Sequence, residues 1–252
     1  MIREKIFEWK NWKEMIHTTW NPKDPGVIRI HMIPPRFRLF RFIPSVVILN
    51  GNQILPLNES WAILLTIFIK ELNQWGEGEM TQEQGREILE NTAVKMRKIF
   101  PNVSPEKFEE DLELIAEVFE DIARGREPKV EIGQMSIGDY APYMTAPHRM
   151  DLMVSAMEKN GRWNCNQHCL HCYAAGQTYS NVQELGTADW KRVIEKCQKA
   201  RIPQLTFTGG EPTMREDLFE LLKEARWFIT RLNTNGIKLT REYCEKLREA
   251  EL

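Results

Sequence analysis

Three cysteines lie close together in the second half of the chain. Cys165, Cys169 and Cys172 have the spacing C-x3-C-x2-C, and no fourth cysteine follows nearby. Thiolates are the usual ligands of iron–sulfur clusters, and a four-iron cluster normally takes four of them. Three thiolates leave one iron open to a small molecule. The spacing therefore predicts a reaction centre and a fold that can wrap a short segment around it.

Other uses of these cysteines remain as alternatives. His168 and His171 lie between them, and zinc binds Cys and His side chains tetrahedrally. Disulfides are disfavoured because the chain has five cysteines, no apolar signal segment and no paired cysteine spacing. The same features favour a reducing, cytoplasmic setting. Cys197 and Cys244 fall on expected helices and are interpreted as small core residues.

Two later stretches strengthen the first interpretation. Residues 206–212 read TFTGGEP and residues 233–236 read NTNG. With the cysteine run, and in this order, they resemble the signature of the radical S-adenosylmethionine (radical SAM) enzymes. The resemblance implies a [4Fe–4S] cluster held by the three cysteines, with S-adenosylmethionine (SAM) bound to its open iron. It also implies an electron donor such as flavodoxin or ferredoxin.

The resemblance also assigns contacts with SAM. Gly209 and Gly210 would let the backbone approach SAM closely, because a glycine has no Cβ. Glu211 would lie near the SAM ammonium, and Tyr173 near the adenine. Thr234 and Asn235 would bond the methionine part. Each also has an ordinary interpretation: turns for the glycines and for residues 235–236, and simple packing for the tyrosine.

The pattern around these motifs alternates strands and helices. Strands are expected over residues 150–157, 204–208 and 228–233, and helices over 188–200 and 214–225. Thr187 is expected to cap the first helix, and Thr240 to open another. Such βα repetition predicts parallel strands with right-handed crossovers, and sites gather at their carboxyl ends. Residues 148–252 are thus expected to form an α/β fold with the first three units of a partial (β/α) barrel. Later units would come from a longer protein or a second chain.

A different pattern precedes this half. A β-branched run over residues 45–49 and a second strand over 53–55 flank the turn signal Asn50-Gly51-Asn52. Helices are expected over residues 59–75, with Asn58 as N-cap, over 81–99, and from Ser104 onward. The last has apolar residues at helical spacing and an opposite acidic face that is interpreted as solvated. Its apolar residues are Phe108, Leu112, Ile115, Phe119 and Ile122.

A hairpin followed by three helices is a winged-helix-like α+β plan. The phrase Leu57-Asn58-Glu59-Ser60 resembles the PqqD-like domain, or RiPP recognition element, here over residues 36–126. RiPPs are ribosomally made, post-translationally modified peptides. The resemblance implies binding of a precursor-peptide leader, and an extended peptide can add to a sheet edge. Arg36, Arg38 and Arg41 would meet acidic leader residues or simply form the polar face of an edge strand. An unrelated helical domain is the alternative. Residues 1–35 are expected to be irregular, with a short helix over residues 3–15 as an alternative, and residues 127–147 are expected to be a linker.

Composition narrows the remaining function classes. The net charge of −2 gives no reason to expect nucleic acid as a partner. The longest apolar stretch, residues 61–69, is too short to span a bilayer, so no membrane association is expected. The leading hypothesis is a radical SAM peptide maturase or its N-terminal portion. Two alternatives are a catalytically silent peptide-binding scaffold and a radical SAM enzyme that acts on a small molecule.

Overall fold

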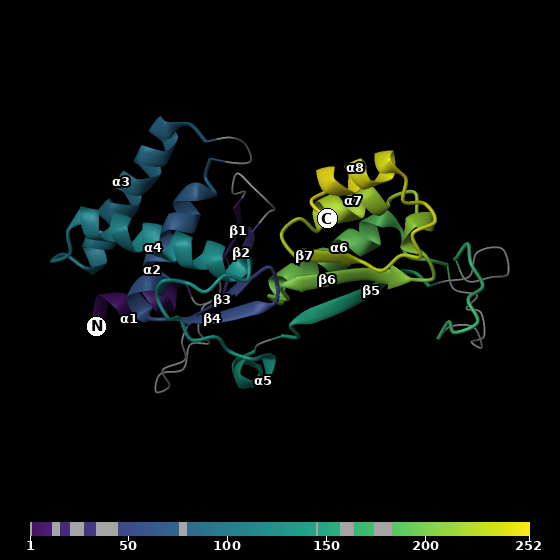
Figure 1. Ribbon diagram of the computed structural model, residues 1–252, viewed down its shortest axis with the longest axis horizontal. Coiled ribbons are helices and arrows are strands. Elements are labelled where there is room, and N and C mark those ends of the chain that lie inside the picture. The colour runs from purple at the N-terminus through teal and green to yellow at the C-terminus, as the bar shows by residue number, and fades with distance from the viewer. Residues whose placement is uncertain are drawn as a thin grey trace. The chain divides into compact units, whose positions relative to one another are not determined.

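The computed structural model describes residues 2–11, 16–20, 28–33, 45–75, 80–144, 146–156, 164–173 and 183–252. The chain divides into two compact units, Met1–Met144 and Thr145–Leu252 (Figure 1). In the part of the chain that is described, no helix has both the length and the apolar character needed to cross a lipid bilayer.

The described part of the N-terminal unit contains an antiparallel sheet in the order β1-β2-β3-β4. Its strands are β1 (Ile16–Trp20), β2 (Ile28–Ile33), β3 (Ser45–Leu49) and β4 (Gln53–Leu57), and the helix α1 (Ile2–Asn11) precedes them. The prediction of an irregular segment over residues 1–35 is therefore wrong for the described residues, whereas the alternative of a short helix over residues 3–15 is confirmed in part by α1. Ile28, Ile30 and Met32 alternate along β2 and are buried in one core, because residues two apart in a strand share a face.

The hairpin between β3 and β4 is confirmed. The Asn52 N–H donates to the Leu49 carbonyl over 3.1 Å and closes the turn. Asn50 and Gly51 between them have φ values of 47° and 73°. These positive values are those that Asn and Gly adopt most easily.

The three following helices begin where the sequence indicates. They are α2 (Glu59–Leu72), α3 (Gln82–Ile99) and α4 (Pro105–Ala123), and the side chains of Asn58, Thr81 and Ser104 cap them. Helix α2 ends at Leu72, three residues before the expected end, and Asn73 forms its C-cap. The expected stop at residues 76–78 lies outside the described residues.

Helix α4 has the two faces that its spacing predicts. The apolar residues that the spacing predicts to face the core are all buried: Phe108, Leu112, Ile115, Phe119 and Ile122. Several acidic residues of the other face pair with cations on or beside the same helix. These pairs are Lys107–Asp111, Arg124–Glu120, Arg126–Asp121 and Lys129–Glu117. The acidic face is thus solvated and partly neutralised by the chain itself.

Part of the segment expected to be a linker, residues 127–147, packs on the N-terminal sheet. Successive residues of a strand point to opposite faces, so Val46, Ile48 and Ile54 form a second apolar face on the N-terminal sheet. Tyr140 of the short helix α5 (Ile137–Tyr140) is buried against this face, and Met135 and Met144 pack beside it. The interpretation of residues 127–147 as a plain linker therefore needs correction, because the segment up to Met144 covers the sheet. A short 3₁₀ helix, η1 (Ala141–Tyr143), completes it.

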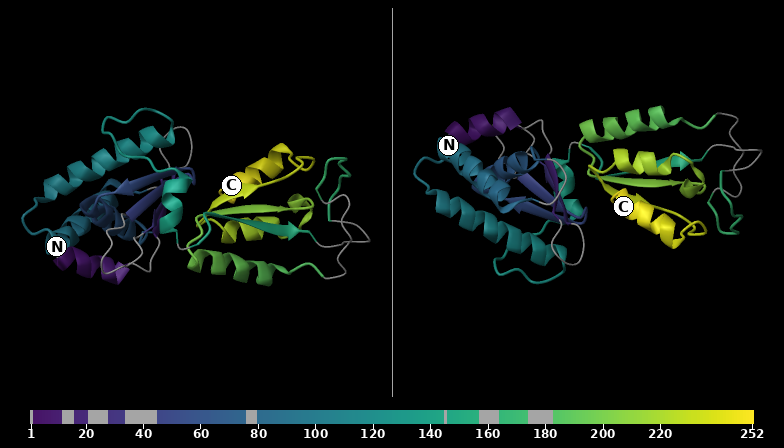
Figure 2. Two further views of the ribbon diagram at one scale, coloured as in Figure 1. Left: turned by 90° about the horizontal axis from the view of Figure 1, so that it is seen from below. Right: turned by 90° about the horizontal axis from the view of Figure 1, so that it is seen from above.

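The C-terminal unit contains three parallel strands in the order β5-β6-β7. The strands are β5 (Arg149–Ser155), β6 (Gln204–Gly209) and β7 (Ile229–Leu232). The helices are α6 (Thr187–Lys199), α7 (Leu218–Glu224) and α8 (Arg241–Glu249). All three lie above the strands in Figure 1, and in the views of Figure 2 the strands run between α6 and α8 in projection. Side chains of the helices and of β5 and β6 share one buried core. The three predicted βα units are confirmed as a mixed α/β structure with a parallel sheet.

Three local predictions in this unit are wrong. Helix α7 begins at Leu218 instead of Met214, because Arg215 is extended, with φ −76° and ψ 135°, after the 3₁₀ turn η2 (Pro212–Met214). Thr187 is the first residue of α6 and does not cap it, since its hydroxyl bonds Asp217. Cys244 is exposed, whereas Cys197 is buried as expected.

Some expectations fall on residues that are not described. Arg36, Arg38 and Arg41 lie in one such stretch, and residues 157–163, which lead to the first cysteine, lie in another.

Candidate active site

The three motifs meet at the carboxyl ends of the parallel strands. Strand β5 ends at Ser155, β6 at Gly209 and β7 at Leu232, and one motif follows or ends each strand. The Glu211 N–H donates to the carbonyl of Asn164, which precedes the first cysteine, over 2.9 Å. The Asn235 side-chain amide donates to Asn166 Oδ1 over 2.8 Å. These two contacts join residues that are 47 and 69 positions apart in the chain.

The three cysteines occupy the edge of this meeting point. Cys165 and Cys169 are partly buried and Cys172 is exposed. The Cys172 N–H donates to the Cys169 carbonyl over 3.1 Å, which turns the backbone between them. In the described residues, no three Cys, His, Asp or Glu side chains converge on one point as ligands of a single ion. The donor set fits an iron–sulfur cluster, because three thiols on one turning segment are the ligand type that such clusters take.

Glu211 is the centre of the hydrogen bonds that join the second and third motifs. It is 1% exposed. Its Oε1 accepts from the Thr213 N–H and hydroxyl over 2.9 and 2.6 Å, and from the Thr234 hydroxyl over 2.7 Å. Its Oε2 accepts from the Asn235 N–H over 2.7 Å. Oε1 thus accepts three of these bonds and Oε2 one, so Oε2 keeps the capacity for a further donor.

The two glycines allow a closer approach than any other residue would. A Cβ on Gly209 would lie 2.8 Å from Ser155 Oγ and 2.9 Å from the Ser155 nitrogen. A Cβ on Gly210 would lie 2.6 Å from the Asn164 carbonyl oxygen and 2.9 Å from that of Ser155. Gly209 also has φ 131°, which a side chain rarely allows. The close neighbours are thus the end of β5 and the start of the cysteine segment, while backbone contact with SAM stays a prediction.

The third motif is both a turn and a contact with the first. The Gly236 N–H donates to the Thr234 hydroxyl over 3.2 Å, and the Ile237 N–H donates to Asn235 Oδ1 over 3.1 Å. Gly236 has φ 79°, a value that favours glycine. The ordinary interpretation as a turn is therefore correct for residues 235–236. It coexists with the contacts to Glu211 and Asn166, and the SAM contacts of this motif stay predictions.

Tyr173 extends from the cysteine segment toward the glycines. Its hydroxyl donates to the Gly209 carbonyl over 3.4 Å, and the residue is 64% exposed. Burial of part of the ring, and then the nearby Cys172, raise the pKa of its phenol. The residue is consequently a neutral, exposed aromatic beside two motifs and does not belong to the buried core.

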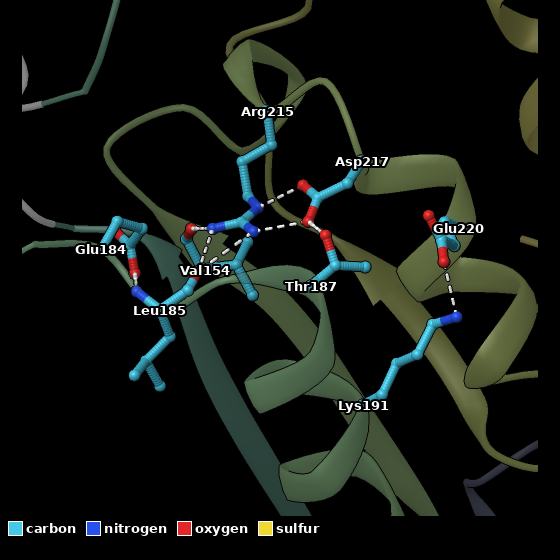
Figure 3. A network of polar contacts seen from close by, with 8 residues as sticks. All are labelled: Val154, Glu184, Leu185, Thr187, Lys191, Arg215, Asp217 and Glu220. Carbon is cyan, nitrogen blue, oxygen red and sulfur yellow. Dashed lines mark hydrogen bonds and ion pairs between the residues drawn. The ribbon is translucent and has the colours of Figure 1, made fainter.

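A second group of polar residues, which sequence reasoning missed, joins the end of β5 to the starts of α6 and α7 (Figure 3). We call Arg215, Asp217 and Thr187 the Arg215 cluster. Arg215 donates to both Asp217 carboxylate oxygens, over 2.8 and 2.7 Å, and Thr187 donates to Asp217 over 2.6 Å. The sequence signal for this cluster was an arginine and an aspartate two positions apart, shortly after the GGEP motif. Asn164 and Asn166, which flank the first cysteine, were also missed.

The charges of this cluster are mutually stabilised. Burial raises the pKa of the Asp217 carboxyl, but hydrogen bonds from Arg215 and Thr187 outweigh it, so the pKa lies below its ordinary value. The Arg215 side chain is 8% exposed. Such a buried guanidinium requires a paired carboxylate, because an uncompensated buried charge is strongly destabilising.

Comparison with known families agrees with this geometry. Residues 164–252 match the model of the Radical SAM superfamily. The match begins at Asn164 and contains the three cysteines, the GGEP motif and the NTNG motif. The chain therefore contains a radical SAM domain over these residues.

Curated relatives share this part of the chain. Fe-coproporphyrin III synthase of Methanosarcina barkeri is 41% identical over 96 residues, which are 36% of this chain and 24% of that protein. The 7,8-dihydro-6-hydroxymethylpterin dimethyltransferase of Methanocaldococcus jannaschii is 35% identical over 133 residues, 49% of this chain and 26% of that protein. PqqA peptide cyclase of Bradyrhizobium diazoefficiens is 37% identical over 90 residues, 35% of this chain and 24% of that protein. The chain spans about a quarter of the length of these relatives.

A solved structure of Streptococcus suis SuiB bound to its precursor peptide SuiA aligns with 81% of this chain and 42% of its own. The sequence identity is 14% and the TM-score is 0.41.

Proposed function

We propose that this chain is part of a radical SAM peptide maturase. The observation that carries the proposal is the hydrogen-bonded meeting of three motifs at the ends of β5, β6 and β7, where Asn164 and Asn166 beside the first cysteine are joined to Glu211 and Asn235. Sites of (β/α) barrels lie at such strand ends. The barrel of which these units would form a part, and the winged-helix-like character of the N-terminal unit, belong to the proposal.

In this proposal Cys165, Cys169 and Cys172 hold a [4Fe–4S] cluster, and SAM binds beside it. When bound and reduced by one electron from a flavodoxin or ferredoxin, the cluster supplies the electron that cleaves SAM into methionine and a 5′-deoxyadenosyl radical, which abstracts a hydrogen atom from the substrate. The protein positions this cofactor chemistry and excludes competing reactions.

The residues of the chain would orient SAM. The second acceptor position of Glu211 Oε2 suits the SAM ammonium, because the other bonds of this carboxylate hold it in place. The backbone of Gly209 and Gly210, with Thr234 and Asn235, would face the methionine part. Tyr173, exposed beside Gly209, would pack on the adenine.

Peptide recognition is assigned to the N-terminal unit. An extended leader peptide would add to an outer strand of its sheet, with backbone hydrogen bonds giving affinity. Support comes from β4, where the Met135 N–H donates to the Ile54 carbonyl over 2.8 Å in an antiparallel bridge. The edge of β4 thus already accepts one extended segment of the chain, and a leader peptide would extend or replace this contact.

The first test is radical initiation. The chain is reconstituted anaerobically with iron and sulfide, reduced with dithionite and assayed for 5′-deoxyadenosine formed from SAM. We expect product that is lost in Cys169→Ala and kept in Cys244→Ala, which removes an exposed thiol remote in sequence from the motifs. A colourless protein that binds zinc would overturn the proposal, and a bound cluster that never yields product would overturn its catalytic part.

The second test addresses the peptide. Synthetic peptides that cover the short reading frames flanking the gene are labelled, and their binding is followed by fluorescence anisotropy. We expect one of them to bind, and to bind more tightly to Met135→Pro, which lacks the N–H that occupies Ile54. Met135→Ala is the matched control because it keeps this N–H. Equal affinity for the two variants would remove the β4 edge from the proposal.

A small-molecule radical SAM enzyme is the second candidate function. It is favoured by two of the relatives, whose names specify a porphyrin product and a pterin substrate. Failure of every flanking peptide to bind, in a protein that cleaves SAM, would select this candidate.

A further inference from the structure

A closed ring of hydrogen bonds includes the first cysteine. The Glu211 N–H donates to the Asn164 carbonyl over 2.9 Å, and Glu211 Oε2 accepts from the Asn235 N–H over 2.7 Å. The Asn235 side chain then donates through Nδ2 to Asn166 Oδ1 over 2.8 Å. Asn164 and Asn166 are the neighbours of Cys165 on its two sides. We call these five residues, all of which the structure describes, the Cys165 ring.

The orientation of the Asn235 amide follows from its surroundings. Its Oδ1 accepts from the Ile237 N–H over 3.1 Å. A side-chain amide has one acceptor oxygen and one donor nitrogen, so the nitrogen points the other way, toward Asn166. The backbone N–H of Asn235 is bonded to Glu211 as well. The residue is thus held at its backbone and at its side-chain oxygen, and its Nδ2 presents a fixed donor to the cysteine segment.

The opposite end of the cysteine segment is attached by a longer bond. Tyr173, the residue after Cys172, donates its hydroxyl to the Gly209 carbonyl over 3.4 Å. Hydrogen bonds from hydroxyl groups are typically about 2.7–2.8 Å long, so this contact is weaker than the bonds of the Cys165 ring. The ring therefore fixes the first cysteine more firmly than this contact fixes the last.

We propose that Asn235, acting through Asn166, is a positioning residue that fixes Cys165 before an iron–sulfur cluster binds. This inference rests on the proposed function, because it takes Cys165 as a cluster ligand. A ligand that is already ordered loses less conformational freedom when the cluster binds. The role differs from the expected contact of Asn235 with the methionine part of SAM. Loss of the bond between the two side chains therefore weakens cluster binding even in the absence of SAM.

The test is a double-mutant cycle of Asn166→Ala, Asn235→Ala and the double variant. Asn235→Ala also removes the acceptor of the Ile237 N–H, and the cycle isolates the bond between the two asparagines from this second loss. Asn166→Asp is the conservative variant, because it keeps an acceptor opposite Asn235 Nδ2. Leu170→Ala is the matched control, since it removes a fully exposed side chain from the same segment.

The first readout is amide hydrogen exchange in protein purified without iron. We expect residues 164–173 to exchange about threefold faster in Asn166→Ala and in Asn235→Ala, as for loss of one exposed hydrogen bond. The double variant should exchange no faster in this segment than Asn235→Ala. Asn166→Asp and Leu170→Ala should match the wild type, and strand β6 should be unchanged in every variant. Equal acceleration of the segment and of β6 would overturn the inference, because it would reduce Asn235 to a general structural residue.

The second readout follows the cluster without SAM. After anaerobic reconstitution, the electron paramagnetic resonance signal of the reduced cluster and the rate of iron loss to a chelator are recorded. We expect about threefold faster iron loss in each single alanine variant, no further change in the double variant, and wild-type behaviour in Asn166→Asp and Leu170→Ala. A loss in Asn235→Ala alone would overturn the inference. If Asn235→Ala fails to fold, the comparison of Asn166→Ala with Asn166→Asp decides the question.

The outcomes separate this inference from the proposed function. If the wild type and all variants bind the cluster equally, the inference is overturned and the proposed function stands. If the wild-type chain binds no cluster, the proposed function fails and the inference fails with it. Losses that add in the double variant would also overturn the inference, because they would show that the two asparagines act independently.

Discussion

The helices of the two units begin in different ways. In the N-terminal unit, α2 to α5 each follow a residue whose side chain accepts a hydrogen bond from an N–H of the first turn. These residues are Asn58, Thr81, Ser104 and Ser136. In the C-terminal unit, α8 has such a cap in Thr240, but α6 and α7 have none. The polar side chains at their starts, Thr187 and Asp217, bond within the Arg215 cluster.

This difference separates two uses of polar residues. A side-chain cap stabilises its helix by about 1 kcal/mol. In the N-terminal unit, each of the helices α2 to α5 has such a cap. In the C-terminal unit Thr187 and Asp217 instead hold Arg215, which donates to the Val154 and Leu185 carbonyls. Polar groups in the first unit thus stabilise individual elements, whereas those in the second fix elements relative to one another.

The largest expected effect is at Glu211. In Glu211→Ala the two Thr213 donors, the Thr234 hydroxyl and the Asn235 N–H lose their acceptor. We expect the free energy of unfolding of the C-terminal unit, measured by urea denaturation, to fall by roughly 3 kcal/mol or more. Glu71→Ala in the N-terminal unit is the matched change, because Glu71 is also buried but pairs with Lys95, which is half-exposed. Equal losses for the two variants would contradict the contrast between the units.

A smaller effect is expected at Gly210. In Gly210→Ala the new Cβ would lie 2.6 Å from the Asn164 carbonyl oxygen, so the cysteine segment or the end of β5 must shift. We expect a loss of about 1–3 kcal/mol in thermal unfolding of the C-terminal unit. Gly85→Ala in α3 is the control, since its new Cβ would have only the Met80 sulfur near it, at 3.9 Å. That variant should gain about 0.5–1 kcal/mol, and destabilisation by both would contradict the steric account.

The third prediction compares a helix start that has a side-chain cap with one that has none. Asn58→Ala removes the acceptor for the Trp61 N–H, which lies 2.8 Å away, and should lower the stability of the N-terminal unit by about 1 kcal/mol. Gly186→Ala, at the uncapped start of α6, should change stability by less than about 0.5 kcal/mol. Chemical denaturation followed by circular dichroism measures both. A larger effect at residue 186 than at residue 58 would reverse the comparison.

The smallest expected effect concerns acid sensitivity. Hydrogen bonds from Arg215 and Thr187 outweigh burial and lower the Asp217 pKa from its ordinary value of 3.8. The contribution of this carboxylate is therefore fully present above that value and is lost as the pH falls through the lowered pKa. We expect Asp217→Asn to be less stable than wild type at neutral pH, and the difference to shrink below pH 3.8. Urea midpoints recorded between neutral and acidic pH test this, and a constant difference would argue against an ionised Asp217.

Features with strong local signals were predictable from the sequence. Asn58, Thr81 and Ser104 mark helix starts because a short polar side chain bonds the first turn, whatever packs around it. The apolar spacing of α4 likewise fixes its buried side. The meeting of the three motifs was also predictable, because the carboxyl ends of parallel strands share one edge.

Features that depend on distant partners were not predictable. Strands β1 and β2 are an exception: the alternation of Ile28, Ile30 and Met32 with Arg29 and His31 was an available strand signal that the interpretation of this segment did not use, and β2 pairs with both β1 and β3. Thr187 looks like a helix cap until Asp217, thirty positions later, takes its hydroxyl. Cys244 was assigned to the core because a short helix does not reveal which of its sides is buried. The four bonds of Glu211 could not be derived, since two of them come from residues 23 and 24 positions away.

The bonds around Glu211 also bear on the order in which the protein is assembled. They connect the second and third motifs through atoms of the polypeptide alone, and the Asn164 and Asn166 contacts add the first motif in the same way. A zinc finger, by contrast, obtains its folding free energy from the metal. We therefore expect this chain to fold first and to be loaded with iron afterwards. Under the proposed function, cells short of iron would then accumulate folded protein without its cluster, and iron supply would set the loaded fraction without changing the amount of protein.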